Sequence, residues 1–400
     1  RECSIQRRFQ KVIEEAPAPH LMAQVAERLY DAALRMGRAI AYDNAGTVEF
    51  VLDAEGGDTP YFLEVNTRLQ VEHPVTELTT GIDLVEWQLR VAAGEPLPLA
   101  QHQISRHGWA IECRLNAEEP EQGYRASLGR VMGYAEPPAQ PGVRVDSGLH
   151  EGSEVTPFYD ALLAKVIGHG PTREQALARA VFGLEQLRIE GLRTNAGLLL
   201  QVLRHPAIHD VLCTRFLEQH FADGPRDEAP VQTSHALAVA AAWSASQPVE
   251  APVWSDFRLT AAAGRRAHIA VSLRDVSAGD HNQTLTLRAR AGDYACAAEP
   301  GLMARVHGQT VPNVVTLRLH DQPAGEVLVR QAGATRWFSW SRGECRVWDV
   351  EHDLRQRAQA SSGTSVQLQL CAVLPGRVAA VLVAPGQQVQ QAEPVLTLEA

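Results

Sequence analysis

The segment YFLEVNTRLQVEHPVTE, residues 61–77, decides how the first half of this chain is interpreted. Every second position from Glu64 to Glu72 is polar, and the positions between them are mostly aliphatic. Side chains of a β-strand alternate between its two faces, so the pattern predicts one extended strand with a polar face. A solvated outer face has this period, and so does a face that binds a ligand. The polar positions are Glu64, Asn66, Arg68, Gln70 and Glu72.

Size and composition limit the classes of protein to consider. A chain of 400 residues is long enough for two to four domains, each with its own core. Its 45% hydrophobic and 21% charged residues are typical of a soluble globular protein. A net charge of −10 argues against a general binder of nucleic acid or of a membrane surface. No apolar run reaches the roughly 18 residues that a membrane span needs.

The chain begins at Arg1, with no basic and apolar leader, so we expect no signal peptide and read the sequence as part of a longer chain. Its six cysteines are scattered without a CxxC pair, which argues against a structural zinc or a disulfide framework and favours a reducing compartment. Lysine occurs only at Lys11 and Lys165, among 37 basic residues. Because the composition favours arginine so strongly over lysine, the two lysines that are present merit inspection.

Hydrophobic periodicity predicts mixed α and β structure in the first half and β structure in the second. Helices are predicted over 20–40, 83–93, 172–188 and 194–204, a hairpin over 47–52 and 61–66, and strands over 109–147. Residues 223–252 are rich in Asp, Pro, Ala and Ser, as in a linker that contains a short helix. Alternating segments from 254 to 350 predict an antiparallel sheet, plausibly closed into a barrel.

A hairpin would place Glu49, in TVEFVL, on the same face as Glu64, with Asn66 one pleat further on. Three such oxygen donors suit Mg²⁺, which keeps waters and bridges phosphate oxygens. Arg68 offers a planar fork that matches a small oxyanion. Glu72 could act as a base where a neighbouring charge and partial burial tune it.

These segments resemble biotin carboxylase. The matching motifs, in the family's order and spacing, are RECSIQRRFQKVIEEAPAP, TVEF, FLEVNTRLQVEHPVTE, WAIECRLNAEEP, VRVDSGLHEGSEVTPFYDALLAKVIGHGPTREQALARA and IEGLRTN. They cover residues 1 to about 222 and are far more specific than one short motif. The second half and the PGRVAAVLVAPGQQV and PVLTLEA segments resemble the α subunit of biotin-dependent acyl-CoA carboxylases.

The resemblance implies an α+β fold: the C-terminal part of an ATP-grasp biotin carboxylase, a β-barrel-like domain and a truncated biotinyl (hammerhead) β domain. The predicted boundaries are 1–95 for the C-terminal part of the ATP-grasp domain, 96–222 for the biotin carboxylase C-terminal domain, 223–252 for a linker with a helix, 253–358 for a β-rich partner-binding domain, 359–371 for a linker and 372–400 for the truncated biotinyl domain.

The resemblance also implies roles in ATP and biotin binding. Glu49 and Glu64, with Asn66, would hold Mg²⁺ or Mn²⁺ on ATP, and Gln6 would contact the nucleotide. Arg114, in ECRLN, would stabilise the biotin enolate oxygen while CO₂ is captured, which is an oxyanion-hole role.

Further roles concern bicarbonate, the second substrate that the resemblance implies. Arg68 would be the catalytic arginine and would bind bicarbonate together with Lys11 and the backbone of Val71. Glu72 would take the proton of bicarbonate, so that bicarbonate attacks the γ-phosphate of ATP and forms carboxyphosphate. Gln70 is grouped with the residues that bind these ligands. The polar positions of residues 61–77 would thus be the floor of a phosphate and bicarbonate site.

A carboxyltransferase β subunit and the biotinyl domain of the same polypeptide are the partners that the resemblance implies, in a homo-oligomer or hetero-oligomer without nucleic acid or membrane. The resemblance favours the 3-methylcrotonyl-CoA branch, and therefore leucine degradation, because of the segment GLRTN and the later segments HPAI and TRFLEQHF. Propionyl-CoA, geranyl-CoA and acetyl-CoA stay open, because the β subunit selects the acyl group. The expected location is the cytoplasm, or the mitochondrial matrix in a eukaryote.

Three departures from the family pattern stand out. Phe9 replaces the usual histidine, so one polar contact to the nucleotide is in doubt, while an apolar contact is still possible. The N-terminal domain and the glycine-rich lid over ATP have no counterpart in these 400 residues, and we expect this chain alone to be inactive. The usual Ala-Met-Lys-Met would begin at Ala400, so the lysine that carries biotin lies outside the chain.

Other interpretations remain open. Another ATP-grasp ligase, joining a carboxylate to an amine or thiol, would share much of the site, and an assembly module would use mainly the β-rich half. Structural roles are expected for four further residues: Lys165 as the partner of a carboxylate in a helix–helix contact, Cys113 as a buried strand residue, and Arg144 and Phe158 in packing or subunit contacts.

Overall fold

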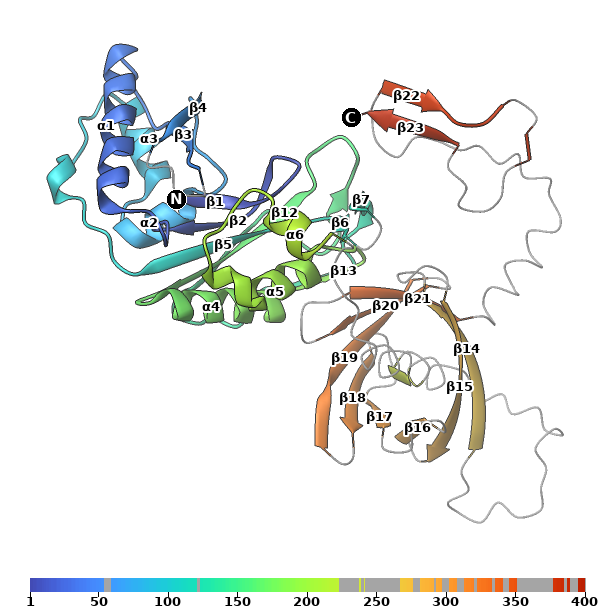
Figure 1. The fold of residues 1–400 in the computed structure, drawn as a ribbon. Coiled ribbons are helices and arrows are strands. Elements are labelled where there is room, and N and C mark those ends of the chain that lie inside the picture. Colours follow the sequence, from blue (N-terminus) through green and yellow to red (C-terminus); the bar gives the residue numbers. More distant parts are fainter. Residues whose placement is uncertain are drawn as a thin grey trace, which may run out of the picture.

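The computed structural model describes residues 1–53, 59–120 and 123–222 and, beyond them, residues 237–238, 241, the eight strands of a barrel, 377–384, 387–388 and 395–399. Within these residues, no helix is both long enough and apolar enough to cross a membrane. The first 222 residues contain mixed α and β structure, as predicted, and form the blue to green part of Figure 1.

A five-stranded antiparallel sheet organises residues 1–222. Its order is β1 (Glu2–Arg7), β2 (Gln10–Ala16), β5 (Trp109–Asn116), β12 (Leu162–Gly170) and β10 (Val143–Ser147). Helices α4 (Arg173–Gln186) and α5 (Ala196–Arg204) cover one face, and α2 (His73–Thr80) lies at the other (Figure 1). The sheet is therefore enclosed on both faces where the strands are longest.

The two faces of strand β5 differ in chemistry. Ile111, Cys113 and Leu115 are buried in the main apolar core, which Leu184 of α4 and Leu199 of α5 join. Close packing there depends on glycine: a Cβ at position 168 of β12 would lie 2.2 Å from a backbone oxygen of α4. Cys113 is fully buried in this strand, as predicted.

The opposite face of the sheet combines a small apolar cluster with charged side chains. Ala16, Ala110 and Ile167 pack against Val75 of α2 in this cluster. Because side chains alternate along a strand, Glu112 and Arg114 lie on the same face as Ala110. Helix α2 therefore packs beside a row of buried charges, and this row forms part of the candidate site.

Predicted helices and hairpins of the first half are confirmed, with small shifts at their ends. They are α1 (Ala23–Ala39), α3 (Leu84–Ala92), α4 and α5, and the antiparallel hairpin of β3 (Thr47–Val51) and β4 (Tyr61–Asn66). Helix α3 begins after Asp83, whose side chain accepts a hydrogen bond from the backbone N–H of Glu86, as an N-cap does.

The predicted extended strand from Tyr61 to Glu72 is wrong in its second half. Strand β4 ends at Asn66, the chain turns, and Glu72 is the residue that precedes helix α2. Pro74 lies in the first turn of this helix, where its fixed φ and missing N–H favour a helix start. The alternation of polar residues therefore continues past the strand, and the side chains beyond Asn66 meet through a turn.

Strands β1 and β2 are joined by the two residues Arg8 and Phe9, both with positive φ (46° and 68°). Two-residue hairpin loops adopt such turns because their twist matches that of the strands. The side chain of Phe9 is 94% exposed at this tip. The position where the family usually has histidine is thus an exposed hairpin tip in this chain.

Short strands, the short α-helix α6 and 3₁₀ turns complete this half. They are β6 (Glu118–Glu119), β7 (Arg125–Ala126), β8 (Gly129–Arg130), β9 (Gly133–Ala135), β11 (Glu154–Val155), β13 (Arg188–Glu190), α6 (Phe216–His220), η1 (Gln101–Gln103) and η3 (Pro206–His209).

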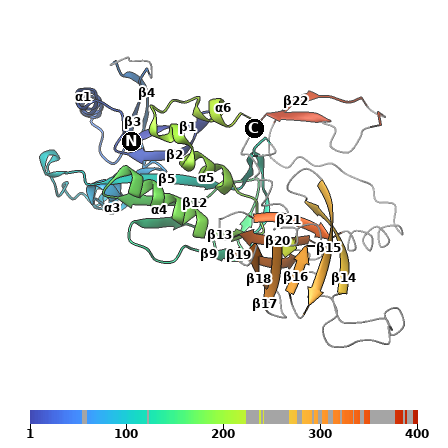
Figure 2. The ribbon, with the colours of Figure 1, turned by 60° about the horizontal axis from the view of Figure 1, so that its bottom comes forward.

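The second half contains a closed antiparallel barrel, orange and yellow in Figure 2. Its strands are β14 (Ala267–Asp275), β15 (His281–Arg290), β16 (Asp293–Cys296), β17 (Leu302–His307), β18 (Asn313–Leu319), β19 (Gln322–Ala332), β20 (Thr335–Trp340) and β21 (Cys345–Val350). A hairpin of β22 (Arg377–Val381) and β23 (Leu396–Glu399) follows. The predicted linker 359–371 and most of the predicted linker 223–252 lie outside the described residues, and all domain boundaries stay predictions.

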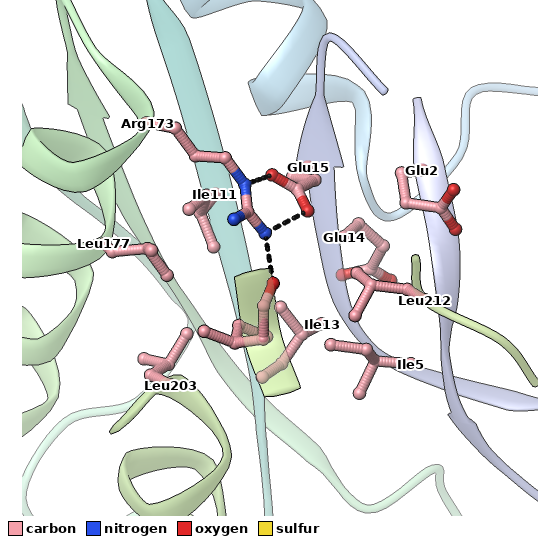
Figure 3. A pocket seen from close by; sticks show the side chains of 11 residues that line it. Glu2, Ile5, Ile13, Glu14, Glu15, Ile111, Arg173, Leu177, Leu203 and Leu212 are labelled. Atoms are coloured by element: carbon pink, nitrogen blue, oxygen red, sulfur yellow. Dashed lines mark hydrogen bonds and ion pairs between the residues drawn. The ribbon is translucent and has the colours of Figure 1, made fainter. Parts of the chain in front are cut away.

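A buried ion pair connects β2 to α4 beside a small pocket that is otherwise mostly apolar (Figure 3). Arg173 donates from Nε to Glu15 Oε2 (2.7 Å) and from Nη2 to Glu15 Oε1 (2.9 Å) and to the carbonyl of Ile208 (2.8 Å). Their side chains are 10% and 5% exposed. Burial raises the pKa of Glu15, and the guanidinium opposes that rise.

We expect Arg173→Met to lower the free energy of unfolding by about 3–5 kcal/mol, because the Glu15 carboxylate would stay buried without its partner. The double variant Arg173→Met with Glu15→Gln should recover much of that loss, since no unpaired charge is then left. Urea denaturation of the four proteins of this cycle measures the coupling. Additive losses in the double variant would show that the two side chains act independently.

Candidate active site

The candidate site forms around the turn of residues 70–72, between β4 and α2. Gln70 and Glu72 are 6% and 1% exposed. Lys11 of β2 donates from Nζ to Gln70 Oε1 (3.0 Å), to Glu72 Oε1 (2.8 Å) and to Glu49 Oε1 (2.8 Å) of β3. One ammonium group thus connects the sheet, the turn and the hairpin.

Charge around Lys11 favours the ionised forms of this lysine and of Glu72. Burial disfavours the ammonium, but its hydrogen bonds to the carboxylates of Glu49 and Glu72 and the charge of Glu72 outweigh burial and raise the pKa of Lys11. Burial likewise opposes the charge on Glu72, yet the hydrogen bond and the charge of Lys11 hold its pKa below the ordinary value. Glu72 is therefore a carboxylate at neutral pH, the form that a base requires.

Arg114 reaches Glu72 from the neighbouring strand β5. Its Nη2 donates to Glu72 Oε2 at 2.9 Å, and its Nε donates to Glu14 Oε1 at 2.5 Å. The side chain of Arg114 is 14% exposed, between two carboxylates that are nearly or fully buried. One end of the guanidinium is therefore held inside the sheet, and the other end lies beside the predicted base.

Hairpin β3–β4 presents the predicted metal ligands side by side. Glu49 and Glu64 are direct partners in the antiparallel register. Asn66 Nδ2 donates to Glu64 Oε1 (2.7 Å) and to Glu49 Oε1 (3.2 Å), and Gln70 Nε2 donates to Glu49 Oε1 at 2.6 Å. All three predicted ligands therefore converge at one end of the hairpin.

The donor set of the hairpin fits Mg²⁺. Rotation of the Asn66 amide would present its oxygen beside two carboxylates, which gives three hard oxygen ligands. Among the described residues, no group of three or more His, Cys, Asp or Glu side chains forms a site caged by the protein alone. A site with so few protein ligands leaves coordination positions for waters and phosphate oxygens, as Mg²⁺ prefers with nucleotides.

Two predicted site residues lie outside these contacts. Arg68 is exposed, and its Nη1 donates to the carbonyl of Leu69 at 3.2 Å. Gln6 is the cross-strand partner of Lys11 in the β1–β2 hairpin and lies next to the site without a described bond to it. The structure thus brings Glu49, Glu64, Asn66, Gln70, Glu72, Lys11 and Arg114 together, and leaves Arg68 at the rim.

The predicted setting of Lys165 is wrong, although its predicted pairing with a carboxylate is confirmed. Lys165 lies on strand β12, not in a helix–helix contact, because LLAKVIGHG continues the sheet beside β5. Its Nζ lies 3.1 Å from Asp146 of β10 and donates to the carbonyl of Val71 at 3.1 Å. Both lysines of the chain therefore contact the turn of residues 70–72.

Sequence reasoning missed the acidic residues that support the site. Glu14, Glu112 and Asp146 received no role, although a carboxylate within an otherwise apolar strand such as WAIECRLN is uncommon and needs a partner. Arg144 contacts Asp146 Oδ1 at 2.7 Å and Glu77 Oε2 at 2.8 Å, which is the packing role predicted for it. The isolated glutamate in WAIECRLN is the feature of the sequence that could have indicated Glu112.

Asp146 makes the stability of this region dependent on pH. Burial disfavours its charge, but Arg144 and Lys165 outweigh burial and lower its pKa from the ordinary 3.8. The folded state therefore stabilises the carboxylate more than the unfolded state does, so the contribution is present above about pH 3.8 and is lost as the pH falls further. Asp146→Asn should thus flatten the acid limb of the unfolding free energy.

Urea denaturation from about pH 5 down to about pH 2 measures this effect. Asp31→Asn is the matched control, because the Asp31–Arg35 pair is 66% and 71% exposed. Exposed pairs contribute little to stability, so the control should keep the acid limb of the unaltered protein. An acid limb that is equally steep in Asp146→Asn would contradict the prediction.

Comparisons with known families match the first half of the chain. A family described as "Carbamoyl-phosphate synthase L chain, ATP binding domain" matches residues 1–100, and one described as "Biotin carboxylase C-terminal domain" matches residues 112–219. Biotin carboxylase 1 of Bacillus subtilis is 45% identical over 221 residues, which are 55% of this chain and 49% of that protein.

Two longer carboxylases match to the same degree. The mitochondrial methylcrotonoyl-CoA carboxylase subunit alpha of Rattus norvegicus is 45% identical over 56% of this chain and 31% of its own length. The mitochondrial propionyl-CoA carboxylase alpha chain of Caenorhabditis elegans is also 45% identical, over 56% of this chain and 31% of its own length. The chain spans about half the length of the biotin carboxylases it matches, and about a third of these longer subunits.

Solved structures agree with the sequence matches. The biotin carboxylase subunit of pyruvate carboxylase is 41% identical, with a TM-score of 0.54 over 56% of this chain and 50% of that one. The biotin carboxylase domain of a thermophilic 2-oxoglutarate carboxylase, described as bound to bicarbonate, is 43% identical, with a TM-score of 0.52 over 55% of this chain and 49% of that one.

Fold, site and matches together show that residues 1–219 have an enzyme fold of the ATP-grasp class. Within this class, these residues are similar to biotin carboxylases, through the matched C-terminal domain at residues 112–219 and the 45% identity to biotin carboxylase 1 of Bacillus subtilis.

Proposed function

We propose that this chain supplies the metal, bicarbonate and biotin side of an ATP-dependent biotin carboxylase within a biotin-dependent acyl-CoA carboxylase. The observation that carries the proposal is the contact of Lys11 and Arg114 with the buried carboxylate of Glu72, each at 2.8–2.9 Å. A base with an ammonium on one side and a guanidinium on the other suits a reaction in which small oxyanions lose a proton and gain charge. Solved relatives described as bound to bicarbonate and to magnesium ADP support the assignment of these ligands.

ATP and its metal would bind at the open end of the hairpin. Glu49, Glu64 and Asn66 would hold Mg²⁺ or Mn²⁺, which would neutralise negative charge on the phosphates. Gln6, on the strand next to Lys11, would contact the nucleotide. Arg68, exposed at the rim, would turn inward to pair bidentately with bicarbonate, a motion that a long surface side chain makes easily.

Bicarbonate would bind against the turn of residues 70–72. Lys11 supplies positive charge, and the backbone N–H of Val71 supplies a donor, while Lys165 holds the carbonyl of the same residue. Glu72 takes the proton of bicarbonate, and the bicarbonate oxygen then attacks the γ-phosphate and releases ADP. Gln70 holds the side chains of Lys11 and Glu49 in place through hydrogen bonds to both.

Arg114 would act in the transfer of CO₂ to biotin. Its Nη2 lies beside Glu72 and can donate to the ureido oxygen of biotin as that oxygen gains negative charge. The biotin itself would arrive on a biotinyl domain of the same polypeptide, attached to a lysine outside this chain.

The β-rich half would bind the partner. We assign the closed barrel of β14–β21 to docking of a carboxyltransferase β subunit and the β22–β23 hairpin to a biotinyl (hammerhead) domain. The acyl substrate would be 3-methylcrotonyl-CoA, and the pathway leucine degradation, although the equal identity to methylcrotonoyl-CoA and propionyl-CoA carboxylases supports either group. The location would be the cytoplasm, or the mitochondrial matrix in a eukaryote.

ATP hydrolysis by the full-length protein tests the proposal. We expect hydrolysis that requires bicarbonate and Mg²⁺ and that rises when free biotin is added, with formation of carboxybiotin. A requirement for an amine or thiol in place of bicarbonate would assign the site to another ATP-grasp ligase. Full activity in Arg68→Ala, together with capture of a carboxyltransferase β subunit by the barrel half, would favour an assembly module.

A further inference from the structure

Glu14 and Glu112 form a buried pair of acidic side chains behind Arg114. Glu14 lies on β2 and Glu112 on β5, and the two residues are direct partners in the antiparallel register. Both are 0% exposed, and they lie on the face of the sheet that carries Arg114. Directly paired cross-strand residues have Cβ atoms about 4.5–5.5 Å apart, so their carboxyl groups can meet.

Hydrogen bonding in this pair is incomplete in a way that indicates a proton between the two groups. Glu14 Oε1 accepts from Arg114 Nε at 2.5 Å, but Glu14 Oε2 and both carboxyl oxygens of Glu112 have no partner among the described residues. Two carboxylates buried this close together cannot both be ionised at low cost. Burial raises the pKa of both groups, the charge of Glu14 raises the pKa of Glu112 further, and the Arg114 guanidinium opposes the rise at Glu14.

We propose that Glu14 and Glu112 hold one proton between them, with Glu112 as the neutral acid that donates to Glu14 Oε2, and that Glu14 is thereby the positioning residue that anchors Arg114. The proposal rests on the function proposed above. Neither glutamate touches the substrates; both act through the arginine.

Charges on the elements packed around the pair favour this distribution of the proton. The charged groups are Arg114 on β5, Lys11 on β2, Lys165 on β12 and Glu72 in the turn before α2, whereas Cys3 on β1 is a neutral thiol. The charge of Lys165 is already balanced by Asp146, and that of Lys11 by Glu49 and Glu72. Arg114 is left to balance the carboxylate of Glu14. A negative charge on Glu112 as well would therefore have no cation to balance it.

The pair explains how Arg114 can serve two partners in turn. Its Nε is anchored by Glu14 inside the sheet, whereas its Nη2 bonds Glu72 at the open side. When Glu72 takes up the proton of bicarbonate, the Nη2 contact weakens, because a neutral acid is a poorer acceptor than a carboxylate. The anchored guanidinium then keeps its direction and offers Nη2 to the oxygen that gains charge on biotin.

The test compares two partial reactions of the full-length protein in Glu14→Gln. Bicarbonate-dependent ATP cleavage relies on Glu72, and carboxybiotin formation relies on Arg114 as well. We expect carboxybiotin formation to fall by about tenfold to a hundredfold, because the guanidinium loses the negative charge that anchors it, and ATP cleavage to fall much less. Glu119→Gln is the matched control: this buried glutamate also pairs with arginines, Arg125 and Arg193, outside the site.

Infrared spectroscopy of the same proteins tests the proton itself. At neutral pH the unaltered protein should show the carbonyl stretch of a buried carboxylic acid, which Glu112→Gln removes and Glu119→Gln leaves in place. Equal losses of both partial reactions in Glu14→Gln, or an acid band that Glu112→Gln does not change, would overturn the proposal. If the full-length protein has neither partial reaction, the proposed function fails, and the infrared result still decides whether the pair holds a proton.

Discussion

Replacing Glu72 by glutamine is expected to lower bicarbonate-dependent ATP cleavage by the full-length protein by about 10²–10⁴-fold, the usual contribution of a positioned general base. Glutamine keeps the size of the side chain and a hydrogen bond from Lys11, but it cannot take a proton. Because the proton transfer precedes both partial reactions, carboxybiotin formation should fall by the same factor. Initial rates at saturating ATP and bicarbonate measure the loss.

Glu77→Gln is the matched control for Glu72→Gln. Glu77 lies on α2, close to Glu72 in sequence, is 8% exposed, and pairs with Arg144 instead of Lys11. The control is expected to lower stability, as loss of a buried ion-pair partner does, and to keep the turnover of the folded enzyme. A Glu72→Gln enzyme that keeps the turnover of the control would show that another group is the base.

Arg114→Met is expected to lower carboxybiotin formation by about 10²–10³-fold, as loss of an oxyanion-stabilising donor does. Bicarbonate-dependent ATP cleavage should persist at a larger fraction of its normal rate, because Lys11 still holds Glu72 as a carboxylate. Methionine also leaves Glu14 without a cation, so a loss of stability of about 3–5 kcal/mol is expected beside the kinetic effect. Chemical denaturation separates the two effects.

Arg125→Met is the control for this second variant. Arg125 also pairs with a buried glutamate, Glu119, but its own side chain is 61% exposed and lies outside the site. We expect near-normal carboxybiotin formation from it. Arg114→Lys should retain less than the unaltered enzyme, since one ammonium cannot span Glu14 and Glu72 as the guanidinium does. Equal activity of Arg114→Met and Arg125→Met would remove Arg114 from the mechanism.

Much of the fold of residues 1–222 could be predicted from sequence because its elements have clear periods and clear ends. The stripe of α1, the N-cap of α3 at Asp83 and the turn-rich residues between β3 and β4 are local features. The end of β4 could not be read from alternation, since polar residues keep a period of two through the turn. Pro74, in the first turn of α2, is a residue that could have indicated the helix that follows.

The chemistry of the site was predicted from the sequence, but the acidic residues that support the site were missed. Glu49, Glu64 and Asn66 meet because hairpin register is a local property. Contacts that join distant strands are different: Glu14 meets Arg114, and Lys165 meets Val71, across separations of 100 and 94 residues. No period in the sequence specifies such pairs. Their positions follow from the order of strands in the sheet, which the sequence pattern left open.

The turn of residues 70–72 also has a consequence for covalent labelling. The chain contains only two lysines, and both ε-amines contact this turn, with side chains 18% and 12% exposed at Lys11 and Lys165. A reagent that acylates amines can therefore modify the α-amine and these two lysines, and both lysines lie at the site. Slow acylation of the two amines would report directly on how often the turn opens, without any engineered probe.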